Sequence, residues 1–228
     1  MKRLSIIIPV YNEEKTIGKL LKKVKSVRIP NVEKEIIVVD GESTDRTPEI
    51  LRKQNGIKVV LNENDRGKGS AVRKGLEFSS GSVVIIQDAD LEYEPEDIVP
   101  CVRPIFRKRA KVVYGSRRLH KPNRKHSSFM FFLGGVVITK FTNLLYGSHL
   151  TDEPTCYKAF DSELLKSLSF KSDGFEWEPE VTAKILRRGI NIWEVPIRYN
   201  PRLEGKKIRC MDGLKAVWTL LRLSFGKI

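Results

Sequence analysis

The residues best placed for chemistry are carboxylates that follow a strongly apolar run. Asp88 and Asp90 come after VVIIQ, and Glu92 follows two residues later. Residues i and i+2 of an extended chain project to the same side, so both aspartates can reach one cation. Carboxylate oxygens suit Mg²⁺ or Mn²⁺, which complete their coordination with substrate phosphates. The spacing predicts a divalent-cation site at Asp88, Asp90 and Glu92; the alternative is an acidic cluster capping a helix that begins near Pro95.

Polar side chains also follow the three earlier apolar runs. They are Tyr11, Asn12 and Glu13 after the first run, Asp40, Glu42 and Asp45 after the second, and Asn62, Arg66, Gly67, Lys68 and Gly69 after the third. For one loop, contact with water is explanation enough, but four successive polar loops favour a shared site. The Gly-Lys-Gly segment does not fit the phosphate-loop pattern GxxxxGK[ST], and no GxGxxG follows the first run. The glycines therefore predict a tight turn before a helix, and a dinucleotide cofactor is disfavoured.

These loops are positioned by an alternation of short apolar runs with helical patterns. The runs at 4–10, 35–40, 57–62, 82–90 and 111–116 are mainly apolar, as strands buried on both faces are. Strands that alternate with helices form parallel sheets whose ligands bind beyond the carboxyl ends of the strands. The sequence therefore predicts an α/β fold with a mostly parallel sheet flanked by helices.

The ordered motifs carry a family resemblance. The segments IIIPVYNEE, VVDGESTDRT, NDRGKGSAVRKG, QDADLEYEP and GSR, followed by TDEPTCYKAF, GFEWEPEV and PRLEGKKI, span about residues 3–210. In this order and spacing they resemble glycosyltransferase family 2 enzymes of GT-A fold. Within that family they are similar to the dolichyl-phosphate mannose synthases and related polyprenyl-phosphate sugar transferases.

The resemblance implies a set of site residues. Nucleotide binding falls to Pro9, Tyr11, Glu13, Asp40, Lys68 and Asp88. The divalent cation falls to Asp88, Asp90 and Glu92, and the donor diphosphate and acceptor phosphate to Arg117, Arg202 and Lys207. Asp90, Arg117 and Arg202 are the implied catalytic residues. The chain departs from the family pattern where Gly41 follows Asp40 and where Glu92 replaces a common glutamine.

The charge distribution fits a phosphate-bearing substrate. Lys and Arg total 42 against 28 Asp and Glu, a net charge of +14, and residues 1–100 are electrically balanced, so the excess lies in residues 101–228. A phosphate monoester is largely ionised at neutral pH, so as an acceptor it needs no general base. This matches a chain whose three histidines occupy no evident catalytic position. Cations that gather two phosphates and a metal that stabilises the leaving diphosphate are what the reaction needs.

The expected activity is inverting transfer of a hexose from a nucleotide sugar to a polyprenyl or dolichyl phosphate. GDP-mannose is the first choice of donor and UDP-glucose the second. A family 2 enzyme with a saccharide acceptor is an alternative, with Glu176 or Glu178 as its base. A basic nucleic-acid-binding module is a remote alternative, because no recognised binding motif accompanies the charge.

Two apolar stretches suit a lipid-borne acceptor. Residues 128–147 follow a basic segment that contains Arg124 and Lys125, and residues 212–228 place Leu214 and Trp218 on one helical face. An apolar face with basic flanks is typical of a helix at an anionic membrane surface; the alternative is packing on the core or on a membrane-embedded partner subunit.

The expected organisation is a GT-A domain over residues 1–210 and a C-terminal amphipathic helix over 211–228, located peripherally at the cytoplasmic face of the membrane. No apolar stretch reaches the roughly 18 residues of a bilayer span. The N-terminal MKRLSIIIPVYNEE is expected to form a strand and not a signal peptide. Three widely spaced cysteines argue against a disulfide framework and favour a reducing compartment.

Overall fold

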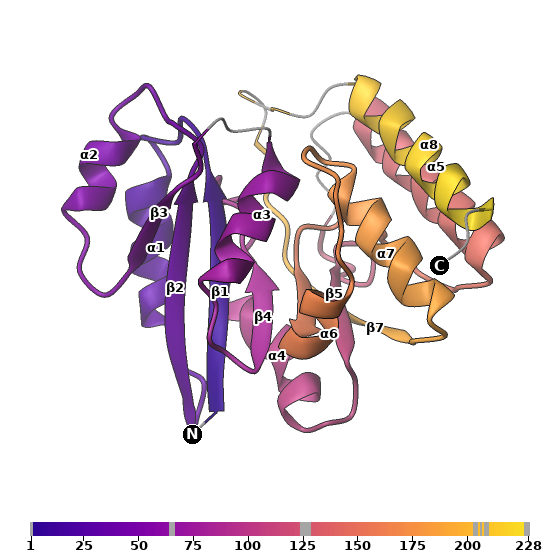
Figure 1. Cartoon of the computed structure of the whole chain (residues 1–228), viewed down its shortest axis with the longest axis horizontal. Coiled ribbons are helices and arrows are strands. Elements are labelled where there is room, and N and C mark those ends of the chain that lie inside the picture. The colour runs from indigo at the N-terminus through magenta and orange to yellow at the C-terminus, as the bar shows by residue number, and fades with distance from the viewer. Residues whose placement is uncertain are drawn as a thin grey trace.

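A computed structural model of the chain describes residues 2–63, 67–123, 129–202, 205, 207 and 210–225. Arg66, Arg124, Lys125 and residues 128 and 226–228, which were included in the expected loops and helices, lie outside these residues. Within them, seven strands form one sheet in the order β3-β2-β1-β4-β6-β5-β7 (Figure 1). The strands are β1 (Lys2–Val10), β2 (Val32–Asp40), β3 (Lys58–Leu61), β4 (Val83–Ile86), β5 (Val112–Ser116), β6 (Lys158–Asp161) and β7 (Ile192–Pro196).

Helices cover both faces of this sheet, with α3 and α7 on the side turned toward the viewer in Figure 1. Apolar residues at helical spacing, such as Ile17, Leu20, Leu21 and Val24 of α1, form the buried side of each helix. The helices are α1 (Ile17–Ser26), α2 (Thr47–Arg52), α3 (Lys68–Glu77), the 3₁₀ turn η1 (Pro95–Asp97), α4 (Ile98–Phe106), α5 (Phe129–Tyr146), α6 (Ser162–Ser167), α7 (Trp177–Arg187) and α8 (Cys210–Phe225).

The sheet is mostly parallel, as the sequence predicts. β1 pairs in parallel with β2 and β4, β2 with β3, and β5 with β7, whereas β6 runs antiparallel to both β4 and β5. The register aligns Val10 with Asp40 and Asp40 with Leu61, so the first three strands end at the same edge. The loops that follow these strands therefore meet, and this edge holds the predicted site residues.

Two features of the sheet differ from the sequence analysis. The strand expected over 82–90 is β4, which ends at Ile86, and the chain then turns, with Leu91 at a φ of +64°. Asp88 and Asp90 therefore lie in a turn and not on an extended chain. Strands β6 and β7 were not anticipated, because both are short and carry polar residues such as Lys158 and Glu194.

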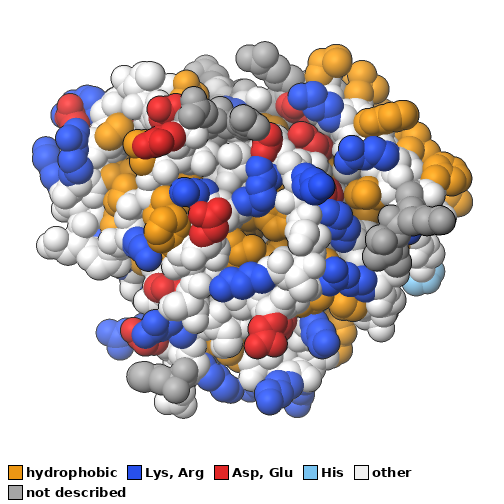
Figure 2. Space-filling view, viewed as in Figure 1, with side chains coloured by type: hydrophobic (Ala, Val, Ile, Leu, Met, Phe, Trp, Pro, Cys, Tyr) orange, Lys and Arg blue, Asp and Glu red, His pale blue; other side chains and the backbone are white. Residues whose placement is uncertain are grey.

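Helices α5 and α8 pack against each other, and α8 also packs on α7. The Tyr146 hydroxyl donates to the Leu220 carbonyl at 2.7 Å, and Arg187 Nη1 donates to the Leu223 carbonyl at 2.7 Å. The outer side of the pair is apolar, and Figure 2 shows hydrophobic side chains gathered where α8 lies. The large apolar side chains that these two helices expose are Met130, Phe131, Leu133, Val137, Leu144, Met211, Leu214, Trp218 and Phe225. None of the described helices combines the length and apolar character needed to cross a membrane.

Candidate active site

The loops after β1 and β2 are locked together at the carboxyl edge of the sheet. Asn12, at a φ of +48°, accepts a hydrogen bond from the Thr44 amide at 2.8 Å through Oδ1 and donates its own amide to Ser43 Oγ at 2.9 Å. Asp40 accepts from Ser43 Oγ at 2.6 Å. Pro9 lies within β1, Tyr11 is exposed just beyond it, and buried Asp40 ends β2. The predicted nucleotide-binding residues of these two strands therefore share one rigid edge.

Glu13 brings together two cations that are almost two hundred residues away in sequence. Its Oε1 lies 3.0 Å from Arg202 Nη1 and 2.8 Å from Lys207 Nζ, and its Oε2 accepts a hydrogen bond from Thr16 at 2.7 Å. Burial alone raises the pKa of Glu13, but the hydrogen bonds from Lys207, Thr16 and Arg202 together hold it below its usual value. Lys207 also donates to the Tyr11 carbonyl. Segments from both halves of the chain thus meet over β1.

The acidic residues after β4 complete this cluster. Asp90 Oδ2 lies 3.7 Å from Arg202 Nη2, and Glu92 Oε1 accepts a hydrogen bond from the backbone amide of Arg202 at 2.9 Å. The Tyr199 hydroxyl donates to Glu92 Oε2 at 2.9 Å. Burial and the neighbouring charges of Asp88 and Glu92 raise the pKa of Asp90 to about 7. Crowded carboxylates of this kind are stabilised by a nearby cation.

The donor set fits a hard divalent ion. Among the described residues no group of three or more His, Cys, Asp or Glu side chains converges as a ready-made metal site. However, Mg²⁺ characteristically takes only one or two carboxylates and fills its remaining positions with water and substrate phosphate. Asp88 and Asp90 can provide those carboxylates, and Glu92 is tied to Tyr199 and the Arg202 amide.

Lys68 lies beneath the acidic turn and not at its surface. Its Nζ is 2.8 Å from Asp88 Oδ1 and 2.8 Å from Glu178 Oε1. Burial acts to lower the pKa of Lys68, but the charge of Asp88, with further contributions from Cys156 and Glu178, raises it well above its usual value. The ammonium group predicted to bind nucleotide is therefore engaged with two carboxylates.

The Gly-Lys-Gly segment has a packing role that its sequence only partly indicates. Gly67 has a φ of +117°, in agreement with the predicted turn. A Cβ on Gly69 would lie 2.2 Å from the Ser172 carbonyl oxygen, and the Gly69 amide donates to the Gly174 carbonyl at 3.2 Å. The start of α3 therefore lies directly against the loop that precedes α7.

Arg117 lies apart from the other two predicted phosphate-binding cations. Its Nε and Nη2 each donate to the carboxylate of Asp152 at 2.7 Å, and Nη2 also reaches the Pro154 carbonyl at 2.9 Å. Its guanidinium carbon is 5.2 Å from the centre of the Tyr199 ring. Tyr199 therefore lies between Arg117 and the cluster formed by Glu92, Arg202 and Glu13.

Two residues of the cluster had no role in the sequence analysis. Tyr199 binds Glu92 and stacks near Arg117, and Asp152 fixes the guanidinium of Arg117. Asp152 belongs to the TDEPTCYKAF segment, so its position was marked, but nothing in the sequence showed that it faces Arg117. Tyr199 lies between motifs, and no spacing rule links it to Glu92.

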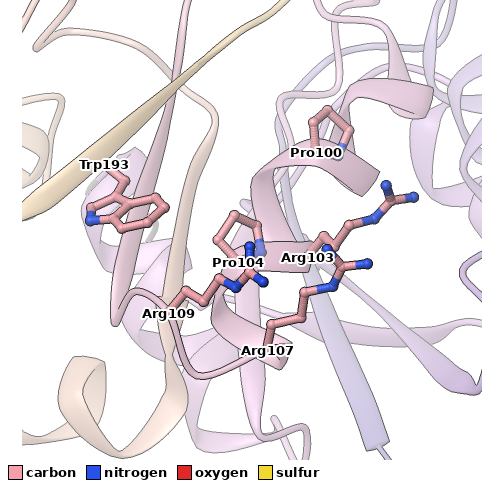
Figure 3. A pocket seen from close by; sticks show the side chains of 6 residues that line it. All are labelled: Pro100, Arg103, Pro104, Arg107, Arg109 and Trp193. Atoms are coloured by element: carbon pink, nitrogen blue, oxygen red, sulfur yellow. The ribbon is translucent and has the colours of Figure 1, made fainter.

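A separate hollow of about 230 Å³ lies at the opposite edge of the sheet. Figure 3 shows Trp193, near the start of β7, facing Pro104 and Arg109. Of the remaining lining residues, Pro100 and Arg103 lie on α4 and Arg107 directly follows that helix. β5 and β7 begin at this edge, whereas the acidic cluster follows the ends of β1 and β4, so the hollow is not part of the candidate site.

Comparisons with known proteins agree with this arrangement. The chain is 30% identical over 220 residues to a dolichyl-phosphate hexose transferase of Haloferax volcanii, which covers 94% of this chain and 90% of the relative. It is 29% identical over 250 residues to a UDP-N-acetylglucosamine–dolichyl-phosphate N-acetylglucosaminyltransferase of Methanococcus voltae, covering 100% of this chain and 98% of the relative. A dolichol-phosphate mannosyltransferase of Pyrococcus furiosus is 26% identical over 212 residues, covering 90% of this chain and 58% of that protein.

The fold matches solved glycosyltransferase structures. Glucosyl-3-phosphoglycerate synthase of Mycobacterium tuberculosis, crystallised with Mn²⁺, uridine diphosphate and phosphoglyceric acid, superposes with a TM-score of 0.75 at 23% identity, covering 98% of this chain and 79% of that one. This likeness confirms the GT-A-like fold predicted from the sequence. The family model for glycosyl transferase family 2 matches residues 5–169, which run from within β1 to just beyond α6 and include the acidic turn. The chain is therefore a member of glycosyltransferase family 2.

Proposed function

We propose that this glycosyltransferase moves a hexose from a nucleotide sugar to a polyprenyl or dolichyl phosphate, with inversion at the anomeric carbon. GDP-mannose is the first choice of donor and UDP-glucose the second. Three similar proteins are named for transfer to dolichyl or dolichol phosphate, and one of these is named for a UDP-sugar donor. These names share the lipid phosphate acceptor and differ in the sugar.

The observation that best supports a phosphate acceptor is the ion pair between Glu178 and Lys68. A hydroxyl acceptor needs a carboxylate base, and Glu178 was one of the two candidates for it. Because its Oε1 accepts a hydrogen bond from the Lys68 ammonium group at 2.8 Å, Glu178 is poorly suited to take a proton from a hydroxyl. A phosphate acceptor is already ionised and needs no such base.

We propose the following roles for the chain's own residues. Tyr11, Glu13 and Asp40 bind the nucleoside beside Pro9. Asp88 and Asp90 would hold Mg²⁺ or Mn²⁺, which would supply positive charge to stabilise the leaving diphosphate. Without substrate, Arg202 and Lys207 neutralise the charge of Glu13. When substrate is present, their N–H groups donate to its phosphate oxygens instead. Arg117, held rigidly by Asp152, offers its remaining donors to the acceptor phosphate.

The lipid acceptor gives the apolar side of α5 and α8 a function. Leu214 and Trp218 of α8 are each more than 60% exposed, and Lys215 and Arg222 of the same helix are also exposed. We propose that this side lies on the membrane, so that the enzyme is peripheral at the cytoplasmic face and receives the polyprenyl chain there. A membrane-embedded partner subunit is the alternative occupant.

A saccharide acceptor remains the rival activity, with Glu176 as its base. Glu176 Oε2 is buried without a hydrogen-bond partner among the described residues. The two activities are separated by incubating the protein with Mn²⁺, dolichyl phosphate, a soluble saccharide and either GDP-mannose or UDP-glucose that is radiolabelled in the sugar, in separate reactions. We expect the labelled sugar to appear in the lipid-containing organic phase, and more of it from GDP-mannose than from UDP-glucose. Label that enters only soluble saccharides overturns the proposal in favour of Glu176.

A further inference from the structure

Lys68 joins three separate elements through one buried ammonium group. It begins α3, Asp88 lies in the turn after β4, and Glu178 lies in the first turn of α7. The two N–O distances are both 2.8 Å, and the side chains of Lys68 and Glu178 are only 9% and 10% exposed. An ion pair this well shielded from water is screened far less than one on the surface.

The backbone around Lys68 leaves the ammonium group little freedom. The Gly69 amide donates to the Gly174 carbonyl at 3.2 Å, and the Ser70 amide donates to the Asp173 carbonyl at 3.0 Å. The absence of a side chain on Gly69 allows this contact, because a Cβ would collide with the Ser172 carbonyl. The first turn of α3 is thus fixed to the loop that leads into α7, and Glu178 and Lys68 hold each other in place.

The charges of the three side chains do not cancel. Lys68 shares one positive charge between two carboxylates, so the group carries a net charge of −1, and Asp88 keeps part of its negative charge. The Oδ1 atom of Asp88 accepts a hydrogen bond from the Lys68 ammonium group. The effect of Glu178 is to draw Lys68 away from exclusive pairing with Asp88.

We propose that Glu178 is a positioning residue that acts through Lys68 to set the negative charge and the orientation that Asp88 presents to a divalent cation. This inference rests on the proposed function, because it concerns the cation that Asp88 and Asp90 hold. It assigns Glu178 a role in place of the base that a saccharide acceptor requires. Partners of metal ligands commonly change metal affinity tenfold or more when they are removed.

The charge arithmetic gives opposite signs for the two single substitutions. In Glu178→Gln, Lys68 pairs with Asp88 alone, so the net charge of the three side chains becomes zero. Mn²⁺ affinity then falls by roughly tenfold. Lys68→Gln leaves both carboxylates without their cation, so the net charge becomes −2 and affinity rises. The double substitution returns the net charge to −1 and restores an affinity close to that of the wild type. A merely structural role for the ion pair predicts weaker binding in all three variants.

The experiment titrates the full chain with Mn²⁺ at mildly alkaline pH without nucleotide. The electron paramagnetic resonance signal of free Mn²⁺ measures how much of the ion is bound. Circular dichroism melting checks that each variant is folded. Lys74 and Glu77, 3.3 Å apart on the surface of the same helix α3, give the control variants Lys74→Gln and Glu77→Gln, which change the same charges and should leave Mn²⁺ affinity unchanged. If Lys68→Gln does not fold, Glu178→Gln and the double variant still provide the predicted loss and recovery.

The possible failures are distinguishable. A wild-type protein that binds no Mn²⁺ overturns the proposed metal use, and this inference with it. Wild-type binding that weakens in both single variants, or that is not recovered in the double variant, overturns the role of Glu178 and leaves the proposed function intact.

Discussion

Arg117 donates two hydrogen bonds to Asp152, each 2.7 Å long, and the Asp152 side chain has no exposed surface. The Arg117 amide adds a third at 2.9 Å. Although burial raises the pKa of Asp152, the charge of Arg117 and its hydrogen bonds hold that pKa below its usual value. The guanidinium is therefore held at a fixed position behind Tyr199 before any substrate binds.

Breaking this pair should destabilise the protein strongly. Asp152→Ala leaves the Arg117 guanidinium without its buried partner, and removing one member of such a pair costs about 3–5 kcal/mol. Equilibrium urea unfolding measures the loss. Glu33→Ala, which removes the exposed partner of Arg3, is the control and should cost about 1 kcal/mol or less. Similar losses in the two variants would show that the Arg117–Asp152 pair contributes no more than a surface contact.

Asp90→Asn should abolish transfer without harming the fold. The substitution removes a proposed metal ligand, so excess EDTA should inactivate the wild-type enzyme in the same way. Because the pKa of Asp90 is raised to about 7, its ionised form costs folding free energy at neutral pH. We therefore expect the Tm of the metal-free variant to equal or exceed that of the wild type. Wild-type turnover by the variant, or full activity in EDTA, contradicts the metal assignment.

Arg202 should matter for phosphate binding beyond its pairing with Glu13. Arg202→Lys keeps the charge but loses the planar fork, so kcat/KM for polyprenyl phosphate should fall roughly ten- to a hundredfold. Arg202→Ala should lose more. Arg198, four residues earlier, pairs with Asp97 on the surface, and Arg198→Ala serves as the control. Steady-state kinetics with varied acceptor compare them, and wild-type efficiency in Arg202→Ala would place the acceptor phosphate elsewhere.

The outer side of α8 should bind anionic lipid. We expect the protein to sediment with vesicles that contain phosphatidylglycerol, and added salt should weaken this binding. Trp218→Ser should reduce the bound fraction because Trp218 is 65% exposed on α8. Trp193→Ser is the matched control, since Trp193 is 45% exposed on β7, away from α8. Equal losses in both variants would exclude α8 as the lipid contact.

The sequence predicted the parts of the fold that repeat. Apolar runs such as 4–10 and 35–40 mark strands buried on both faces, and the rule for parallel sheets placed Glu13, Asp40 and Asp88 at one edge. β6 escaped notice because its four residues include Lys158, whose buried ammonium lies 3.8 Å from the centre of the Tyr114 ring. A buried lysine breaks the apolar pattern on which strand prediction depends.

Pairings between distant side chains were beyond the reach of the sequence. By residue type alone Glu176 and Glu178 are equally suited to act as a base, and only the contact of Glu178 with Lys68, 110 residues away, distinguishes them. Arg117, Arg202 and Lys207 are all cations in matching motifs, yet only Arg202 and Lys207 meet at Glu13. Motif spacing fixes which strand end a residue follows, whereas its partner depends on how loops from different elements pack.

The most direct test of the proposed function compares a phosphate acceptor with two acceptors that offer only hydroxyl groups. With one radiolabelled nucleotide sugar and Mn²⁺, the protein is given a polyprenyl phosphate, the polyprenol of the same length, or a soluble saccharide. A phosphate acceptor that needs no base predicts labelled lipid from the polyprenyl phosphate alone. Transfer to the polyprenol or the saccharide at a similar rate would contradict the account, because those hydroxyls react only with the help of a base.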